Sequence, residues 1–436
     1  MKHAFLGLAV SFALAGAARG GENWPQWRGP SLDGTSDSTG LPLKWSETEN
    51  VKWKVKLPSW SGATPVIWGD RMFVPSAGGI VDGAEANNLK GLKKEGKDLL
   101  LLCLSKKDGK ELWRTQVAGA NYQVMRQNMS SPSAVTDGTM VWWNTGTGVL
   151  TALTVEGKQL WQEDLQTKWG KFGLNHGYGA SPLLYEGMVI VPVLHGMKTD
   201  DPSYLVAFEG KTGKVVWRVE RPTDAKNESP DAYTTPMLMK VGDRTEMVVV
   251  GGDYFTGHDP KTGRELWRCG GLNPKQDPWF RAVCSPAIVG DMAFARIKQG
   301  PLVGCRGGGK GDVTSTHTLW TTKDGCDVPT AVSDGVLLYV LHDGGLMSCF
   351  EPATGKVLYE KQRLPQGTYW SSPLLADGRI YVTNHGGRTT VIAQGPEFKV
   401  LSENPLDDTY TLSSIAVSGK ELFIRTSTSL YCIAAK

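Results

Sequence analysis

A short motif that recurs along the chain constrains the fold more than any other feature. The motif is a small residue and a proline, an apolar run, an acidic-glycine turn and a second apolar run, as in residues 64–74. Its eight copies, the last of them degenerate, begin at Thr64, Ser131, Ser181, Thr235, Ser285, Pro329, Ser372 and Ser414. The spacing is near the roughly 40–45 residues of a four-stranded propeller blade.

A second motif follows most copies of the first. A polar residue, glycine and a basic residue precede an aromatic three positions later, at residues 108–113, 156–161, 212–217, 262–267 and 354–359. The glycine suits a tight hairpin turn with positive φ. The aromatic falls on the following strand, where we expect it to cover the neighbouring blade.

Each repeat therefore predicts four antiparallel strands, A to D. The eighth copy ends on its strand C, and residues 51–57 near the N-terminus look like the missing strand D. Pairing them would close the ring and remove its free sheet edges. We predict an all-β chain with a single eight-bladed β-propeller of four-stranded blades over residues 51–436, preceded by an N-terminal extension at residues 21–50.

These paired motifs resemble the pyrroloquinoline-quinone-like (PQQ-like) β-propeller repeat family, over about residues 50–436. The opening Trp-Pro-Gln-Trp-Arg-Gly-Pro at residues 24–30 resembles the start of exported bacterial members. The resemblance implies either a quinoprotein alcohol dehydrogenase or a non-enzymatic assembly factor. The fold alone does not show which of these two functions applies.

Residues 1–20 are typical of a signal peptide, with Lys2 before an uncharged apolar run and small residues at positions 15–18. The alternative is an uncleaved anchor. We expect a periplasmic or secreted protein with no transmembrane segment after cleavage. The net charge of +3 gives no basic stripe, so nucleic acid is not an expected partner.

Antiparallel strands place the A–B and C–D turns on one side of the disc, here the turn face, and the D–A and B–C connections on the other, the loop face. Function usually lies on irregular loops of a rigid scaffold. The candidate ligand- or partner-binding residues on the loop face are Trp60, Arg126, Asn128, His176, Tyr178, Tyr233, Asp253, His258, Trp279, Arg281, His342, Tyr369, Trp370, His385, Arg388 and Tyr410. The alternative is that the aromatics among them only plug the channel.

Histidines and cysteines each allow a further reading. Five of the seven histidines map to the loop face, but none has a recognised metal spacing, so no metal is predicted. Four cysteines cluster in blades four and five and suggest one or two disulfides of undetermined pairing, or four unpaired thiols: Cys269, Cys284, Cys305 and Cys326. An insertion at residues 78–98 is predicted to fold over the loop face or to be a solvated excursion.

This chain lacks two motifs that the resembled quinoprotein dehydrogenases carry. The chain has no adjacent Cys-Cys pair and no Cys-x-x-Cys-His haem motif. No catalytic residue is therefore assigned and no cofactor is expected; PQQ with Ca²⁺ enters only under the alternative of a quinoprotein dehydrogenase oxidising an alcohol or sugar. The favoured hypothesis is an exported, non-catalytic binding or scaffold module that presents its loop face to a protein, peptide or saccharide.

Overall fold

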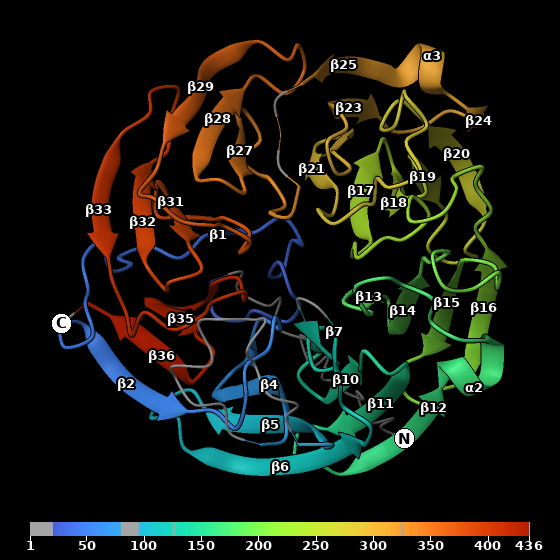
Figure 1. Cartoon of the computed structure of the whole chain (residues 1–436). Helices are drawn as coiled ribbons and strands as arrows, with labels where there is room; N and C mark the ends of the chain where they lie inside the picture. Colours follow the sequence, from blue (N-terminus) through green and yellow to red (C-terminus); the bar gives the residue numbers. More distant parts are fainter. Residues whose placement is uncertain (1–20, 80–95, 125–126, 324, 326, 436) are drawn as a thin grey trace, which may run out of the picture.

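The computed structural model describes residues 21–79, 96–124, 127–323, 325 and 327–435; the predicted signal peptide and most of the 78–98 insertion lie outside these ranges. Within them, eight four-stranded sheets follow one another around a central axis in chain order (Figure 1). The predicted all-β, eight-bladed propeller is confirmed. No helix in the described part has the length and apolar character needed to cross a membrane.

Each blade runs from an inner strand A to an outer strand D. The first four blades are β3 (Val66–Trp68), β4 (Arg71–Ala77), β5 (Leu99–Ser105) and β6 (Glu111–Ala118); β9 (Val135–Thr136), β10 (Met140–Asn144), β11 (Val149–Thr154) and β12 (Gln159–Asp164); β13 (Leu183–Tyr185), β14 (Met188–Val193), β15 (Tyr204–Glu209) and β16 (Val215–Glu220); and β17 (Met237–Val241), β18 (Arg244–Gly251), β19 (Tyr254–His258) and β20 (Glu265–Cys269).

The remaining blades have the same order of strands. They are β21 (Ala287–Val289), β22 (Met292–Ala295), β23 (Leu302–Arg306) and β25 (Thr318–Thr322); β26 (Val332–Ser333), β27 (Leu338–His342), β28 (Leu346–Phe350) and β29 (Val357–Arg363); β30 (Leu374–Ala376), β31 (Arg379–Thr383), β32 (Thr389–Ala393) and β33 (Val400–Asn404); and β34 (Ala416–Ser418), β35 (Glu421–Arg425), β36 (Ser429–Ala434) and β2 (Val51–Lys56).

Short elements decorate this ring. β1 (Thr35–Ser36) adds to the inner edge of blade seven, and β24 (Gly311–Asp312) to the outer edge of blade four. The connections carry the ribbon of β7 (Gln123–Val124) and β8 (Gln127–Asn128), and the helices α2 (Leu165–Trp169) and α3 (Thr314–His317).

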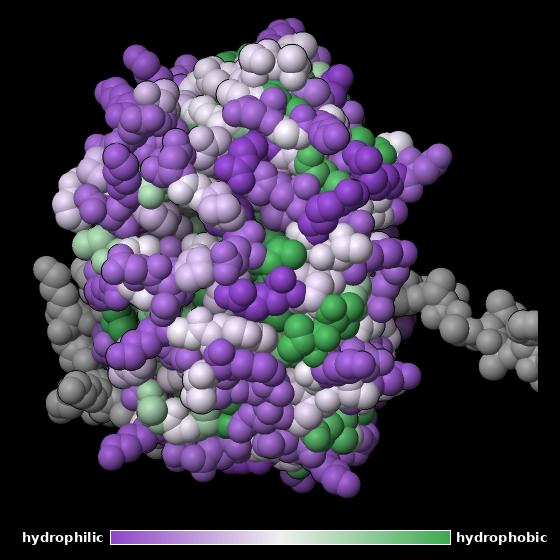
Figure 2. Space-filling view, turned by 90° about the vertical axis from the view of Figure 1, so that its right-hand side faces the viewer, coloured by the Kyte–Doolittle hydropathy of each residue, from purple (hydrophilic) through white to green (hydrophobic). Residues whose placement is uncertain are grey.

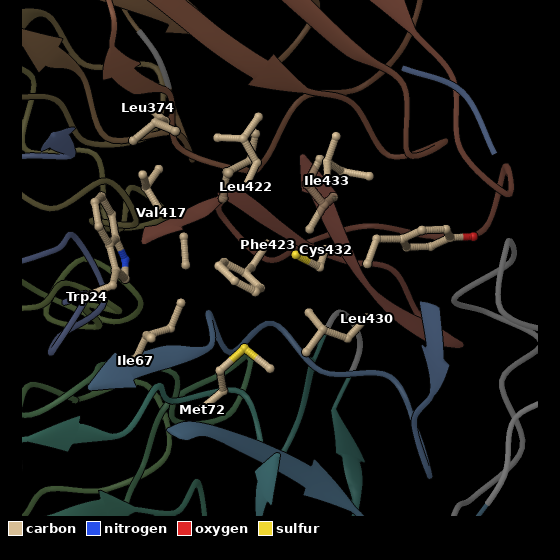
Figure 3. Packing of buried hydrophobic residues seen from close by; sticks show 14 of the residues in the cluster. Trp24, Ile67, Met72, Leu374, Val417, Leu422, Phe423, Leu430, Cys432 and Ile433 are labelled. Carbon is tan, nitrogen blue, oxygen red and sulfur yellow. The ribbon is translucent and has the colours of Figure 1, made fainter. Parts of the chain in front are cut away.

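The N-terminal strand closes the ring as predicted. β2 pairs antiparallel with β36, and Trp53 lies opposite Cys432, as Trp113 lies opposite Cys103 in blade one. Figure 3 shows the apolar cluster formed where blade eight meets blade one, in which Phe423 and Ile67 pack near Trp24 of the N-terminal segment. Blade eight is therefore built from both ends of the sequence, with β34, β35 and β36 from the C-terminal end and β2 from the N-terminal end.

Five outer-strand tryptophans pack between blades, as predicted, whereas Trp267 bonds within its own blade. At five junctions the Trp indole N–H donates to a backbone carbonyl in the next blade: Trp53 to Lys106, Trp113 to Val155, Trp161 to Gly210, Trp217 to Pro260 and Trp320 to Pro352. The ring lies over the glycine of the next C–D turn; a Cβ on Gly355 would meet Trp320 at 2.7 Å. The repeated glycine and the repeated aromatic are therefore the two partners of a single contact between neighbouring blades.

The rim of the disc carries no broad apolar surface on the side of β16 and β20, where Figure 2 shows small apolar patches separated by hydrophilic residues. Val216 on β16 is one of the few large apolar side chains that are half exposed. Scattered single apolar residues of this kind are normal on a soluble surface.

Candidate functional site

The central channel opens on the loop face as a pocket of about 400 Å³. All eight blades contribute to its wall, and Trp27 of the N-terminal segment also lines it. The polar and aromatic side chains around it are Trp27, Gln127, Ser131, Ser133, His176, Ser181, Tyr233, Thr235, Arg281, Lys298, Asp327, Asp343, Trp370, Ser372 and Ser414. A concave site with aromatic surface and a few converging polar groups is the usual form of a ligand site.

A closed belt of hydroxyls forms the wall of the channel. At the start of each strand A, one backbone N–H donates to the Ser or Thr hydroxyl of the next blade, over 2.9–3.2 Å. The eight members are Thr64, Ser133, Ser181, Thr235, Ser285, Thr330, Ser372 and Ser414. Because every bond crosses a blade junction, the belt fixes the blades to one another at the pocket wall.

The belt corrects the repeat alignment in two copies. In blade two the equivalent residue is Ser133, not Ser131, and in blade six it is Thr330, not Pro329. The feature shared by all eight repeats is therefore the hydroxyl that accepts the neighbouring N–H. The proline beside it is not present in every repeat. Blades two and six have alanine after the belt hydroxyl.

The N-terminal segment closes the far end of the channel. Its carbonyls accept hydrogen bonds from Ser418 and Gly419 of blade eight and Thr136 of blade two, and Trp24 bridges Ile67 of blade one. The segment thus lies across the inner strands at the turn face, and Figure 1 shows it in blue at the centre of the ring. Ligand access to the pocket is from the loop face.

Arg28 anchors this segment beside Trp27. Its guanidinium donates to the carbonyls of Asp33, Ala331 and Pro373 at 2.7–2.9 Å. Burial lowers the pKa of Arg28 to about 10, so it stays charged at neutral pH. Three carbonyls from the N-terminal segment and blades six and seven therefore hold the floor of the pocket in place.

A buried carboxylate organises the basic side of the pocket mouth. Glu228 Oε1 lies 3.2 Å from His176 Nε2 and 3.6 Å from Arg281 Nη1, and accepts from Asn175 Nδ2 at 3.1 Å. The backbone N–H of His176 donates to the Tyr233 hydroxyl at 3.0 Å. Glu228 does not line the pocket itself; it positions two side chains that do.

Two carboxyl groups of blade six lie next to this basic side of the mouth. Asp343 Oδ1 accepts from the backbone N–H groups of Asp327 and Val328 at 3.0 and 3.1 Å. Burial, and to a smaller extent the charge of Asp343, raise the pKa of Asp327 to about 6. The positive charges of Arg281 and Lys298 act in the opposite direction and lower this pKa. Asp327 lines the pocket, and its Oδ1 is buried without a hydrogen-bond partner among the described residues.

Asp231 holds two loops at the same mouth. Its carboxylate accepts three backbone N–H groups, from Asn175 at 2.7 Å, Gly196 at 2.9 Å and Met197 at 3.1 Å. Burial raises the pKa of Asp231 to about 6. Because all its bonds are to backbone, Asp231 is a structural group that shapes the loops around the pocket.

The predicted loop-face residues divide by position. Four of them line the pocket: His176, Tyr233, Arg281 and Trp370. Five are buried behind it and support the loops: Trp60, Asn128, Tyr178, Tyr369 and Tyr410. His385 packs between Trp370 and Tyr410, with ring centroids 4.3 and 4.7 Å away.

Other predicted residues lie away from the pocket. Asp253 accepts hydrogen bonds from Ser229 and Asn273, and Trp279 is exposed; His342 and Arg388 contact Ser348 and Glu403. Arg126 lies outside the described residues.

The expected place of His258 on the loop face is wrong. Residues Tyr254–His258 form strand β19, and His258 lies at its turn-face end, where Nδ1 contacts the Gly263 carbonyl at 2.9 Å. Burial lowers the pKa of His258 to about 4, so it is neutral.

The predicted residues omit several members of the site, among them Trp27, Lys298 and Glu228. Trp27 carried a signal, because it lies in the distinctive segment at residues 24–30. Lys298 and Glu228 carried none, since each comes from an irregular loop and becomes relevant only when eight loops converge in space.

The pocket does not fit the calcium-bound quinone of the resembled dehydrogenases. Across the described ranges, no three His, Cys, Asp or Glu side chains are grouped so that they could hold a metal ion. The basic residues Arg281 and Lys298 could face a carboxylate, but each also faces Asp327. No reaction step is therefore derived through a quinone.

The fold and its central pocket define an eight-bladed propeller with a ligand-sized site on one face. The family profile described as outer membrane protein assembly factor BamB matches residues 37–168, 97–235, 147–319 and 309–395. The chain belongs to this PQQ-like β-propeller family. No curated protein sequence matches it significantly.

Solved structures share the fold at low sequence identity. BamB from Moraxella catarrhalis has a TM-score of 0.61 and 15% identity, covering 87% of this chain and 98% of its own. A europium-containing methanol dehydrogenase reaches 0.69 at 12% identity, covering 95% of this chain and 98% of its own. The quinohemoprotein alcohol dehydrogenase from Comamonas testosteroni reaches 0.67 at 12%, covering 97% and 82%. At such identities the likeness concerns the fold alone.

Proposed function

We propose that this protein is a non-catalytic binding module of the bacterial cell envelope that takes a saccharide unit into the central pocket of its loop face. The observation that carries the proposal is the pocket of about 400 Å³, in which aromatic surface is combined with donors and acceptors in close alternation. Its volume suits one or two sugar rings at the end of a larger glycan.

The chemistry of the pocket mouth supports a hydroxyl-rich ligand. Arg281 and Lys298 are donors, whereas Asp327 and Asp343 are acceptors when ionised. Neighbouring hydroxyls of a sugar both donate and accept, so they can bridge such pairs. The opposite charges offset one another and favour a neutral ligand over a simple anion or cation.

Two tryptophans supply the apolar surface that a sugar ring needs. Trp27 at the floor and Trp370 at the wall present flat apolar faces, against which the C–H face of a sugar ring packs. The hydroxyl belt adds further polar groups, including those of Ser133 and Ser372. Because the belt and Arg28 fix the wall and floor, little ordering is needed on binding.

The cell-envelope location is part of the proposal. It is supported by the predicted signal peptide at residues 1–20. The similarity to an outer membrane protein assembly factor is consistent with it.

A glycan array of bacterial envelope oligosaccharides tests the proposal, with the purified full chain as the analyte. We expect binding to a defined subset of glycans, lost in Arg281→Ala and in Trp370→Ala. Arg388→Ala is the matched control, because Arg388 is an exposed arginine paired with Glu403 outside the pocket. Binding that is absent, or equal in all three variants, would contradict the proposal.

A quinoprotein dehydrogenase is the second candidate. It is supported by the structural likeness to a methanol dehydrogenase and a quinohemoprotein alcohol dehydrogenase, and not by the pocket, where the described residues offer no grouped metal ligands. Its test is addition of PQQ with Ca²⁺ to the purified protein. Saturable uptake with dye-linked oxidation of an alcohol would establish it, and an unchanged melting temperature without turnover would leave the binding module as the function.

A further inference from the structure

Among the described residues, the junction between blades four and five is one of three that lack the tryptophan contact joining the other five. On β20 of blade four, the Trp267 indole N–H donates to Glu246 Oε2 of its own blade at 2.6 Å. The equivalent tryptophans at five other junctions donate to the next blade, as Trp217 does to Pro260. The junction between blades four and five must therefore be held in another way.

The C–D connection of blade five supplies part of this replacement. Instead of a tight turn, it reaches back so that β24 pairs in parallel with β20, with Trp267 opposite Gly311. Figure 1 shows β24 and α3 beside β20 at the upper right of the ring. Besides its two residue pairs, this connection joins blade four through three further hydrogen bonds. They run from Val313 N–H to the Arg268 carbonyl, from Gly270 N–H to Thr314 Oγ1 and from Gly308 N–H to Glu246 Oε2.

Two cysteines lie at this junction. Cys269 ends β20 of blade four, and Cys305 lies on β23 of blade five; both belong to one apolar cluster and are fully buried. Thr318 stands opposite Cys305 in the β23–β25 ladder, and its hydroxyl lies 3.6 Å from Cys269 Sγ. The ladder thus brings the two sulfurs to the same place.

The two thiols also affect each other's ionisation. The interaction with Cys305 lowers the pKa of Cys269, and the interaction with Cys269 raises the pKa of Cys305. Each sulfur lies near a backbone carbonyl, Cys269 Sγ at 3.9 Å from Gly270 O and Cys305 Sγ at 3.5 Å from Arg306 O. Both residues are free thiols in this structure. A disulfide needs the two Cβ atoms about 3.5–4.5 Å apart, so the pairing requires both side chains to turn away from these carbonyls and toward each other.

We propose that Cys269 and Cys305 form a disulfide that joins blade four to blade five when the chain folds under oxidising conditions. Two thiols lose two protons and two electrons and form one S–S bond. A disulfide oxidant, such as glutathione disulfide or an envelope thiol oxidase, accepts them and is reduced to two thiols. The cross-link would replace the missing tryptophan contact at this junction.

The remaining described cysteines are placed differently. Cys284 Sγ donates to the Arg296 carbonyl at 3.1 Å, in another cluster. Cys349 lies opposite Tyr359 within its own blade, in the slot where a small side chain is required. Cys349 is therefore a matched control: it is a buried strand cysteine in the neighbouring blade.

Refolding the denatured full chain with glutathione disulfide, followed by alkylation and peptide mapping, tests the pairing. We expect one linked pair of peptides carrying residues 269 and 305, and two fewer titratable thiols than the seven cysteines of the chain. The linkage persists in Cys349→Ser and disappears in Cys305→Ser. Seven free thiols in the refolded wild type, or a link between other cysteines, would overturn the proposal.

Thermal unfolding gives a second measurement that does not depend on the variants folding. The oxidised wild type should melt roughly 4 °C above the sample refolded and kept in reductant, because the bond closes a loop of moderate length in the unfolded chain. Cys349→Ser should show the same difference between oxidised and reduced samples. Equal melting temperatures of the oxidised and reduced wild type would also contradict the proposal.

Discussion

Replacing Asp327 with asparagine should stabilise the protein at alkaline pH and have little effect in acid. Asp327 lies at the pocket mouth, where burial raises its pKa from 3.8 to about 6 and Oδ1 has no hydrogen-bond partner among the described residues. Asparagine has the same shape and no charge, so it removes the cost of burying the carboxylate.

The magnitude follows from proton linkage. The unfolded chain ionises Asp327 near pH 3.8, whereas the folded protein retains that proton until about pH 6. Between these values the folded state binds more protons, so this group makes the free energy of unfolding fall as pH rises. One pKa unit corresponds to about 1.4 kcal/mol, which gives a loss of about 3 kcal/mol, complete above pH 6.

Urea denaturation near pH 4 and near pH 8 measures this effect. Asp327→Asn should raise the free energy of unfolding by up to about 3 kcal/mol near pH 8 and by close to zero near pH 4. Asp231→Asn is the matched control: its pKa is raised to a similar value, but its carboxylate accepts three backbone N–H groups, so the amide should destabilise at both pH values. A change for Asp327→Asn that does not depend on pH would refute the reasoning.

Three further substitutions test the architecture by calorimetric or denaturant unfolding. Gly355→Ala should destabilise by about 2–3 kcal/mol more than Gly335→Ala; both glycines have positive φ, but only at Gly355 would the Cβ meet Trp320, at 2.7 Å. Ser372→Ala should cost about 1–3 kcal/mol, because it leaves one buried N–H of the belt unpaired, and Ser372→Thr should restore most of it. Arg28→Ala should cost at least about 3 kcal/mol and expose the N-terminal segment to protease, since three carbonyls lose their donor; equal protease resistance would show that the segment is held by other contacts.

The repeated elements could be predicted from the sequence because each blade restates the same local requirements. Glycine with positive φ in the C–D turn and an aromatic on the next strand recur in fixed register, and Trp53 revealed the closing strand by matching Trp113. Errors arose where two alignments were locally equivalent. Serines flank Pro132 on both sides, and only the inter-blade hydrogen bond identifies Ser133 as the belt residue.

The centre of the ring could not be predicted in the same way. The distinctive residues 24–30 marked the N-terminal segment, but the segment has no periodic pattern. Its sequence therefore did not indicate that Trp27 lines the pocket and that Arg28 reaches blades six and seven. Lys298 and Asp327 meet only because the loops of adjacent blades converge. His258 was misplaced because Gly-His-Asp reads as a turn, whereas the histidine ends a strand.

The most direct test of the proposed function is calorimetric titration of the purified full chain with the glycan bound most tightly on the array. The account predicts saturable binding with one site per chain, which Arg281→Ala abolishes and Arg388→Ala leaves unchanged. Equal affinity in the wild type and both variants would place the ligand outside the central pocket. Uptake of PQQ with Ca²⁺ and alcohol turnover, without any glycan binding, would contradict the account.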